Sequence, residues 1–223
     1  MQGALAYTSY IRLGTPRRRE VALTFDDGPS QYTPALLRVL RRARAPATFF
    51  ELGDAVRQRP GVTRLQSRQG FAIGDHTRDH PAMTGLSAAS QRAEIASAAR
   101  AIQAAGAPYP RLFRPPFGSF DATTLFELRR AGMLMVLWTV DTKDFSQPGT
   151  RRIIYTAVSG ARPGAIILMH DGGGPRRQTI AALPRIILRL RQRGYRLVTV
   201  PQLVADDPPP RHQPPPLPLS GRS

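Results

Sequence analysis

Five apolar, strand-like runs in this chain end in polar residues that can do chemistry. The first run ends at Asp26 and Asp27, and the last ends at His170. The runs between them lead into a histidine pair, an arginine and two aspartates, namely His76, His80, Arg114, Asp141 and Asp144. Because the carboxyl ends of parallel strands in a barrel meet at one mouth, we expect these side chains to share a pocket. Their composition is that of a mononuclear metal hydrolase.

Asp26 and Asp27 stand side by side at the end of the apolar run 21–25. Adjacent carboxylates repel each other, and the repulsion raises a pKa. The conflict is resolved if one carboxylate binds a metal and the other stays free as a base. The sequence that follows, Gly28-Pro29, is also typical of a plain turn, so this pair alone does not establish a site.

His76 and His80 are four residues apart, so on a helical turn both imidazoles would lie on one face and reach one ion. With one aspartate they make three protein ligands and leave positions open for water and substrate, as catalytic zinc sites do. The same donors suit iron(II). The chain has no cysteine, which excludes thiolate ligands and disulfides. A purely structural histidine pair is the alternative.

His170 follows the apolar run 165–169 and could protonate a leaving amine or alcohol. That role needs a carboxylate that holds the imidazole in one tautomer. Asp141 or Asp144 could supply it, and the residues alone leave both open. A buried histidine at a strand end, satisfied by the backbone, is the alternative.

Arg114 comes directly before two prolines and could keep Asp26 ionised, because a guanidinium binds a carboxylate in a planar pair. A surface salt bridge is the alternative for this arginine. Trp138 and Phe145 could form an apolar wall for a sugar ring, although large aromatic residues usually pack in the core.

The hydrophobic pattern predicts the elements that must position these residues. Strands are expected at 19–26, 47–50, 71–75, 111–114, 133–140, 164–169 and 195–200. Helices are expected at 33–45, 54–69, 87–105, 121–131, 150–160 and 177–193. This alternation predicts an α/β domain with a parallel sheet, and about seven strands in this length suit a barrel. An open doubly wound sheet is the rival, but no glycine-rich phosphate loop follows the first strand.

The charge is strongly positive, with 32 Lys and Arg against 15 Asp and Glu, a net charge of +17. Such a field attracts polyanions, whether nucleic acid, an anionic cell-wall polymer or a lipid surface. The arginines are dispersed and no nucleic-acid motif is present, so no nucleic acid partner is expected. No run approaches the ~20 apolar residues of a membrane span, and no signal peptide is visible.

The composition divides the chain into three parts. Residues 1–18 form an N-terminal extension and residues 19–204 a catalytic domain. Residues 205–223 are rich in proline, which favours neither helix nor central strand, and are expected to be a disordered tail.

The polar segments together resemble the polysaccharide deacetylase family, also called carbohydrate esterase family 4 or the NodB-homology domain. Five motifs stand in the family's order, at 24–30, 76–81, 114–118, 141–145 and 168–171. The resemblance implies a distorted (β/α) barrel with fewer than eight repeats. It also implies that Asp27, His76 and His80 bind a divalent metal, usually zinc, with cobalt or another divalent ion as alternatives.

The resemblance further implies the catalytic roles. Asp26 is the base and Arg114 orients it. His170 is the general acid, tuned by Asp144. A backbone N–H near Phe117 helps to stabilise the oxyanion.

Two aromatic positions depart from the family's commoner residues. Phe117 stands where tyrosine is commoner, and Phe145 stands where tryptophan is commoner. Both changes should alter the sugar cleft more than the chemistry. With Trp138 and Asp141, these two are the expected substrate-binding residues.

The implied activity is removal of N-acetyl groups from an N-acetylglucosamine-type polysaccharide. Peptidoglycan is the first expectation, because a cationic enzyme is drawn to an anionic cell wall, and chitin oligomers are the second. An O-acetyl esterase or small-amide hydrolase on the same scaffold stays open, as does a non-catalytic module that binds polyanions or carbohydrate. A monomer at the cell envelope is expected, with the cytoplasm left open.

Overall fold

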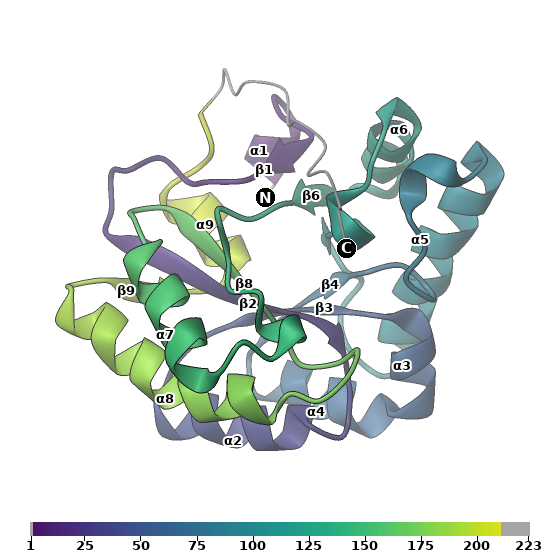
Figure 1. The fold of residues 1–223 in the computed structure, drawn as a ribbon. Coiled ribbons are helices and arrows are strands. Elements are labelled where there is room, and N and C mark those ends of the chain that lie inside the picture. Colours follow the sequence, from purple (N-terminus) through teal and green to yellow (C-terminus); the bar gives the residue numbers. More distant parts are fainter. Residues whose placement is uncertain (1, 211–223) are drawn as a thin grey trace.

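A computed structural model describes residues 2–210, in which nine strands form one sheet. The strand order is β1-β6-β5-β4-β3-β2-β8-β7, with β9 also pairing with β2. All the strand pairs are parallel, and the sheet curls into a half-barrel (Figure 1). The strands are β1 (Tyr10–Ile11), β2 (Glu20–Gly28), β3 (Thr48–Glu51), β4 (Ala72–Asp75), β5 (Leu112–Phe113), β6 (Leu134–Val136), β7 (Val140–Asp141), β8 (Ala165–His170) and β9 (Arg196–Val198). The predicted α/β class is confirmed.

Helices follow most strands and pack on the sheet. They are α1 (Gln2–Leu5), α2 (Thr33–Arg42), α3 (Gly53–Gln58), α4 (Pro60–Arg68), α5 (Ala88–Ala104), α6 (Ala122–Ala131), α7 (Thr150–Ser159), α8 (Arg177–Gln192) and α9 (Val200–Asp206), with 3₁₀ turns η1 (Met83–Gly85), η2 (Pro116–Gly118) and η3 (Asp144–Ser146). Helix α6 begins with a capping box, in which Asp121 accepts from the Thr124 N–H at 2.8 Å. It ends at Gly132, whose φ of 65° is the left-handed conformation that glycine adopts freely.

The two faces of the sheet bury separate cores, because side chains alternate along each strand. Leu23 and Phe25 of β2 join the outer core with α2 and α8, and Phe25 stacks on Phe49 with ring centroids 5.3 Å apart. Ala22 points the other way, into a core that α9 fills from inside the curl through Leu203. Burying a side chain such as Leu23 stabilises the fold by about 1.5–3 kcal/mol. Replacing it with alanine should cost about 2–5 kcal/mol.

Several element boundaries differ from the prediction. The apolar run 133–140 forms two strands, because β6 pairs with β5 and β1 whereas β7 pairs with β8. The predicted helix 54–69 is interrupted before Pro60, where Arg59 leaves the helical conformation with φ −136°. The predicted strand 195–200 ends early, and α9 follows with Thr199 as its cap.

Both terminal segments contact each other. Strand β1 lies within the predicted N-terminal extension and pairs with β6. The Tyr7 hydroxyl donates to the Pro209 carbonyl at 3.0 Å, and the Thr15 hydroxyl donates to Asp207, which is fully buried. Packing therefore continues to about residue 209, inside the predicted tail, and positions 211–223 of that tail lie outside the described residues. Within residues 2–210, no helix has the length and apolar character needed to cross a membrane.

Candidate active site

The register of the parallel strands brings the predicted residues together. Asp26 of β2 stands beside His170 of β8. On the other side, Glu51 of β3 pairs with Asp75 of β4, and Asp75 pairs with Phe113 of β5. His76 and Arg114 are the next residues along their strands, so they emerge at the same mouth as Asp27.

Asp27, His76 and His80 form a compact set of possible metal ligands, with one ligand atom from each lying within 4.8 Å of the others. Oδ1 of Asp27 lies 3.4 Å from Nε2 of His76 and 3.3 Å from Nε2 of His80. This oxygen is buried and has no hydrogen-bond partner among the described residues. A buried polar atom without a partner is costly, and a cation held by the three donors would satisfy it.

The protonation states also suit a cation. Burial alone would raise the pKa of Asp27, but the nearby histidines, His76 first among them, outweigh it and hold that pKa far below its ordinary value. Burial, followed by repulsion from His76, lowers the pKa of His80 to about 4. An ionised carboxylate and a neutral imidazole are the forms that bind metals.

The histidine pair lies in a loop, and the expected helical turn is wrong. Thr77 and His80 both have φ of 73°, which a helix does not allow, and Asp27 has φ of 72°. The hydrogen bonds that hold the loop include one from the Thr77 N–H to Asp75 at 2.8 Å and one from the His80 N–H to the Thr77 hydroxyl at 3.0 Å. The imidazole rings still converge, with centroids 5.0 Å apart. Strained backbone of this kind gathers at functional sites.

Gly173 closes the other side of Asp27. A Cβ at this position would lie 2.4 Å from Oδ2 of Asp27, and the residue has φ of +71°. Only glycine satisfies both conditions, so the glycine-rich segment after β8 lets the backbone approach the carboxylate.

Asp26 is buried and paired with Arg114, whose guanidinium donates to Oδ1 at 2.7 Å. The same guanidinium donates to the Thr24 hydroxyl at 2.8 Å. The other oxygen of Asp26, Oδ2, lies 3.9 Å from Nε2 of His76 and so faces the ligand cluster. Asp26 thus has one oxygen held and one oxygen available beside the cluster.

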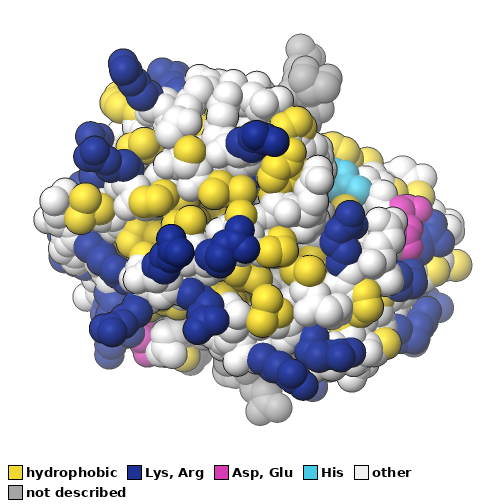
Figure 2. Space-filling view, turned by 90° about the horizontal axis from the view of Figure 1, so that it is seen from below, with side chains coloured by type: hydrophobic (Ala, Val, Ile, Leu, Met, Phe, Trp, Pro, Cys, Tyr) yellow, Lys and Arg dark blue, Asp and Glu magenta, His cyan; other side chains and the backbone are white. Residues whose placement is uncertain are grey.

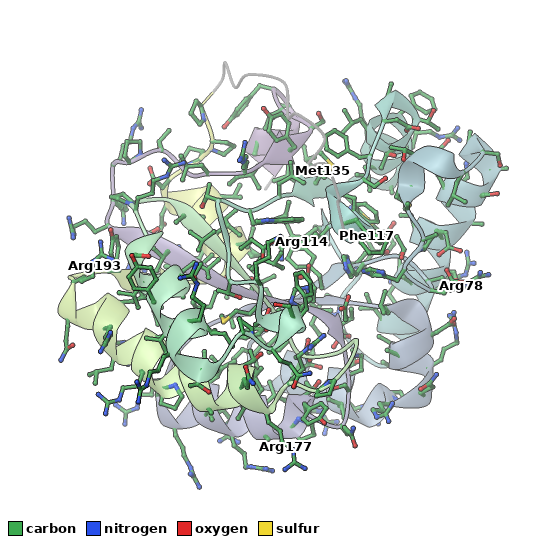
Figure 3. The ribbon with its side chains drawn as sticks, viewed as in Figure 1. Arg78, Arg114, Phe117, Met135, Arg177 and Arg193 are labelled. Carbon is green, nitrogen blue, oxygen red and sulfur yellow. The ribbon has the colours of Figure 1, made fainter. Side chains whose placement is uncertain are left out.

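Arg114 is itself fully buried and lies near the middle of the view, close to Phe117 (Figure 3), and two aromatic rings pack against its guanidinium. Its guanidinium carbon lies 4.1 Å from the Phe50 ring centroid and 5.6 Å from that of Trp138. Trp138 therefore packs on this arginine through a half-buried ring. Its expected role as a sugar wall stays a prediction.

His170 pairs with Asp144, at 2.7 Å between Nδ1 and Oδ1. The choice between the two candidate aspartates is thereby resolved geometrically, because Asp141 pairs with Lys143 at 2.9 Å. Burial would lower the pKa of His170, but the Asp144 hydrogen bond and charge and the charges of nearby aspartates outweigh it and raise the pKa to about 9. The raised pKa favours the protonated imidazole near neutral pH, which is the form that a general acid requires.

Two exposed phenylalanines stand beside these groups. Phe117 is 55% exposed, and its ring centroid lies 4.5 Å from that of His80, edge on. Phe145 is 48% exposed and lies 5.5 Å from the His170 ring. Large apolar rings that are exposed at the mouth of a site are available to pack on a ligand. The expected role of both phenylalanines in substrate binding stays a prediction.

A family model described as polysaccharide deacetylase matches residues 13–136. The chain belongs to this family. A chitooligosaccharide deacetylase of Bradyrhizobium is 38% identical, over 88% of this chain and 99% of its own length. A peptidoglycan-N-acetylglucosamine deacetylase of Bacillus cereus is 36% identical, over 88% and 94%. A solved peptidoglycan N-acetylglucosamine deacetylase bound to a naphthalenyl hydroxybenzamide aligns with a TM-score of 0.87 and 29% identity, covering 94% of this chain and 99% of that one.

Not every solved member of the polysaccharide deacetylase family is described as active. A family pseudoenzyme from Bacillus anthracis aligns with a TM-score of 0.82 and 30% identity, covering 87% of this chain and 68% of that one. Membership of the family therefore does not by itself establish activity, which depends on the residues of the site.

Sequence reasoning missed four supporting groups of this polysaccharide deacetylase. The Thr179 hydroxyl of α8 donates to Oδ2 of Asp144 at 2.6 Å. Thr24 could have been found, because it lies two residues before Asp26 and so on the same face of β2. Glu51 and Asp171 are fully buried behind the site. Burial raises the pKa of Glu51 to about 8 and that of Asp171 to about 7, so protonated forms are present near neutral pH.

Proposed function

We propose that the protein is a metal-dependent hydrolase that removes N-acetyl groups from N-acetylglucosamine-type polysaccharides. One observation carries the proposal. The three-donor cluster of Asp27, His76 and His80 adjoins Asp26, and the strand register sets His170 beside Asp26. A base and an acid thus stand at one metal site, which amide hydrolysis requires and simple binding does not.

The metal would be held by Asp27, His76 and His80, and we propose zinc. Two imidazoles and one carboxylate would supply three protein ligands, the number that catalytic zinc sites use. A divalent ion supplies Lewis acidity, which lowers the pKa of water and polarises an acyl carbonyl.

Asp26 would be the base. Its Oδ2 would accept a proton from the attacking water as the new carbon–oxygen bond forms. Arg114 holds Oδ1 at 2.7 Å, so the base is oriented with Oδ2 left free for the proton. The backbone N–H of Phe117 would donate to the oxyanion that develops on the former carbonyl oxygen.

His170 would be the acid. Asp144 holds Nδ1, which leaves Nε2 to donate its proton to the amide nitrogen. The carbon–nitrogen bond then breaks, acetate departs, and the sugar amine keeps the proton. Asp26 loses its proton to solvent and His170 regains one, so the cycle balances.

Peptidoglycan is our first candidate substrate and chitin-type oligomers are our second. The relatives described above include deacetylases named for each of these polymers. The net charge of +17 would concentrate the enzyme at an anionic cell wall, which favours peptidoglycan and a place at the cell envelope. We further propose a monomer, because one chain supplies every residue of the site.

The test is acetate release from N-acetylglucosamine oligomers and from peptidoglycan, by enzyme as purified, after chelation, and after chelation with zinc restored. We expect acetate release that chelation abolishes and zinc restores. The ratio of acetate release from the two polymers identifies the substrate class. If zinc binds at one equivalent but neither polymer releases acetate, the N-deacetylase proposal fails, and acetylated esters become the next substrates to assay.

A further inference from the structure

The outer helices α2, α7 and α8 are rich in arginine and free of carboxylates. Helix α2 carries three arginines, α7 two and α8 four, and none of these helices contains an aspartate or glutamate. Helices α3, α5 and α6 each combine an acidic residue with arginine. Positive charge is therefore concentrated on one side of the molecule.

This charge is not neutralised within the part of the chain that the structure describes. The ion pairs found there involve arginines elsewhere, such as Arg57, Arg78 and Arg92. On α8, Arg191 donates instead to the backbone carbonyls of Ala43 at 2.8 Å and Arg44 at 3.0 Å. Anions that neutralise these arginines must then come from outside the described chain.

An apolar groove runs through the middle of this basic face, between α2 and α8. Its volume is about 430 Å³, and its apolar lining is Val39, Ala43, Pro184, Ile187 and Leu188. Leu188 is 47% exposed, and Arg42 borders the groove. Figure 2 shows this face from below, with yellow side chains surrounded by dark blue ones and acidic side chains only near the margins.

The two features together restrict the partner. A soluble polyanion would satisfy the arginines but would leave the apolar groove in water. An anionic phospholipid bilayer satisfies both, because its phosphates bind the guanidinium groups while apolar side chains enter the boundary between headgroups and acyl chains. Arginine is suited to this position, since its aliphatic stem packs on apolar surface while its charged head stays at the interface. We propose that the face formed by α2, α7 and α8 binds an anionic phospholipid bilayer.

The geometry leaves the active site accessible in the bound state. The buried sides of α2 and α8 pack on the outer face of β2 and β8, whereas the candidate catalytic residues lie at the carboxyl ends of these strands. Attachment through the helix face therefore does not cover the mouth. The inference does not depend on the proposed activity, because lipid binding is measured without any substrate.

Vesicle co-sedimentation tests the proposal, using phosphatidylcholine vesicles with and without phosphatidylglycerol. We expect binding only to the anionic vesicles, weakening as salt is raised. The double variant R42E/R185E reverses one arginine at the groove and one that lies one turn before Leu188 on α8. It should bind at least about tenfold more weakly, since each basic residue near the surface is worth ~1 kcal/mol. The control R129E/R130E makes the same charge change on α6.

The apolar contribution is tested separately with Leu188→Gln, which changes no charge. It should weaken vesicle binding severalfold and leave binding to soluble heparin unchanged. Thermal midpoints of all variants check that they fold. The proposal is overturned if no anionic vesicle binds, if the α6 control loses as much binding as R42E/R185E, or if Leu188→Gln has no effect, which would indicate a site for soluble polyanions.

Discussion

Nδ1 of His76 lies 2.7 Å from the backbone carbonyl oxygen of Arg114, so one residue orients both the histidine and, through its guanidinium, the carboxylate of Asp26. The carbonyl fixes the tautomer of His76 with its proton on Nδ1, which leaves Nε2 free to bind a cation. The site is therefore a single hydrogen-bonded unit that joins the base to the ligand cluster.

The two adjacent aspartates should separate metal binding from turnover. Asp27→Ala should lose the metal, because it removes a ligand, whereas Asp26→Asn should keep about one equivalent of zinc and lose about 10²–10⁴-fold in kcat. Metal content by mass spectrometry and acetate release would be measured on both variants. Full activity in Asp26→Asn would refute its assignment as the base.

Gly173→Ala should weaken the metal site without replacing a ligand. The new Cβ would push on Oδ2 of Asp27, and a roughly tenfold loss of zinc affinity is expected, as for other changes around a metal site. Gly70→Ala is the matched control, because Gly70 has φ of +80° and open space around its Cα. Equal zinc affinity in both variants, by competition with a chromogenic chelator, would contradict this account.

Asp144 should set the alkaline limit of activity. His170 must be protonated to act as an acid, so activity is lost as the pH rises through its pKa of about 9, or below that value when a bound cation repels the proton. Asp144→Asn removes the charge that raises this pKa and should move the limit to lower pH. The control Asp141→Asn removes an equal charge that is not bonded to His170, and its profile of kcat/KM should keep the original limit.

Glu51 should make stability depend on pH. Its pKa of about 8 in the folded protein exceeds the ordinary value of 4.5, so its contribution to stability is fully present below pH 4.5 and is lost as the pH rises through 8. This loss of folding stability should be on the order of a few kcal/mol. Glu51→Gln should reduce it, because glutamine does not titrate. Urea titrations of both proteins at several pH values would give their free energies of unfolding. If the two free energies changed in parallel with pH, Glu51 would not be the cause of the loss.

Much of this architecture is predictable because the polar residues follow strand-forming runs. The run before Asp26 and the run before His170 both become buried strands, and their parallel pairing dictates the meeting of the two residues. Asp144 could not be chosen over Asp141 from the chain alone. The choice depends on the 3₁₀ turn η3 and on Thr179 of α8, which reaches Asp144 from a helix distant in sequence.

The histidine loop shows a different limit of prediction. A spacing of four residues is compatible with a helical turn, but Asp75 accepts from the Thr77 N–H and diverts the backbone into left-handed conformations. Local side-chain bonds of this kind compete with helix formation and depend on the burial of the neighbouring strand. The two imidazole rings converge in the observed loop, as they would on a helical turn. The ligands could therefore be predicted from the spacing, but the backbone conformation could not.

The central position of β2 in the sheet has a consequence for biosynthesis. This strand is made well before its partners β8 and β9, and the Thr24 hydroxyl bonds to a carbonyl 143 positions later in the chain. A chain emerging from the ribosome therefore carries an apolar strand with one open edge until β8 has been synthesised. Such an edge invites pairing with other chains, so the nascent protein should require protection by chaperones, and truncation before β8 should lead to aggregation.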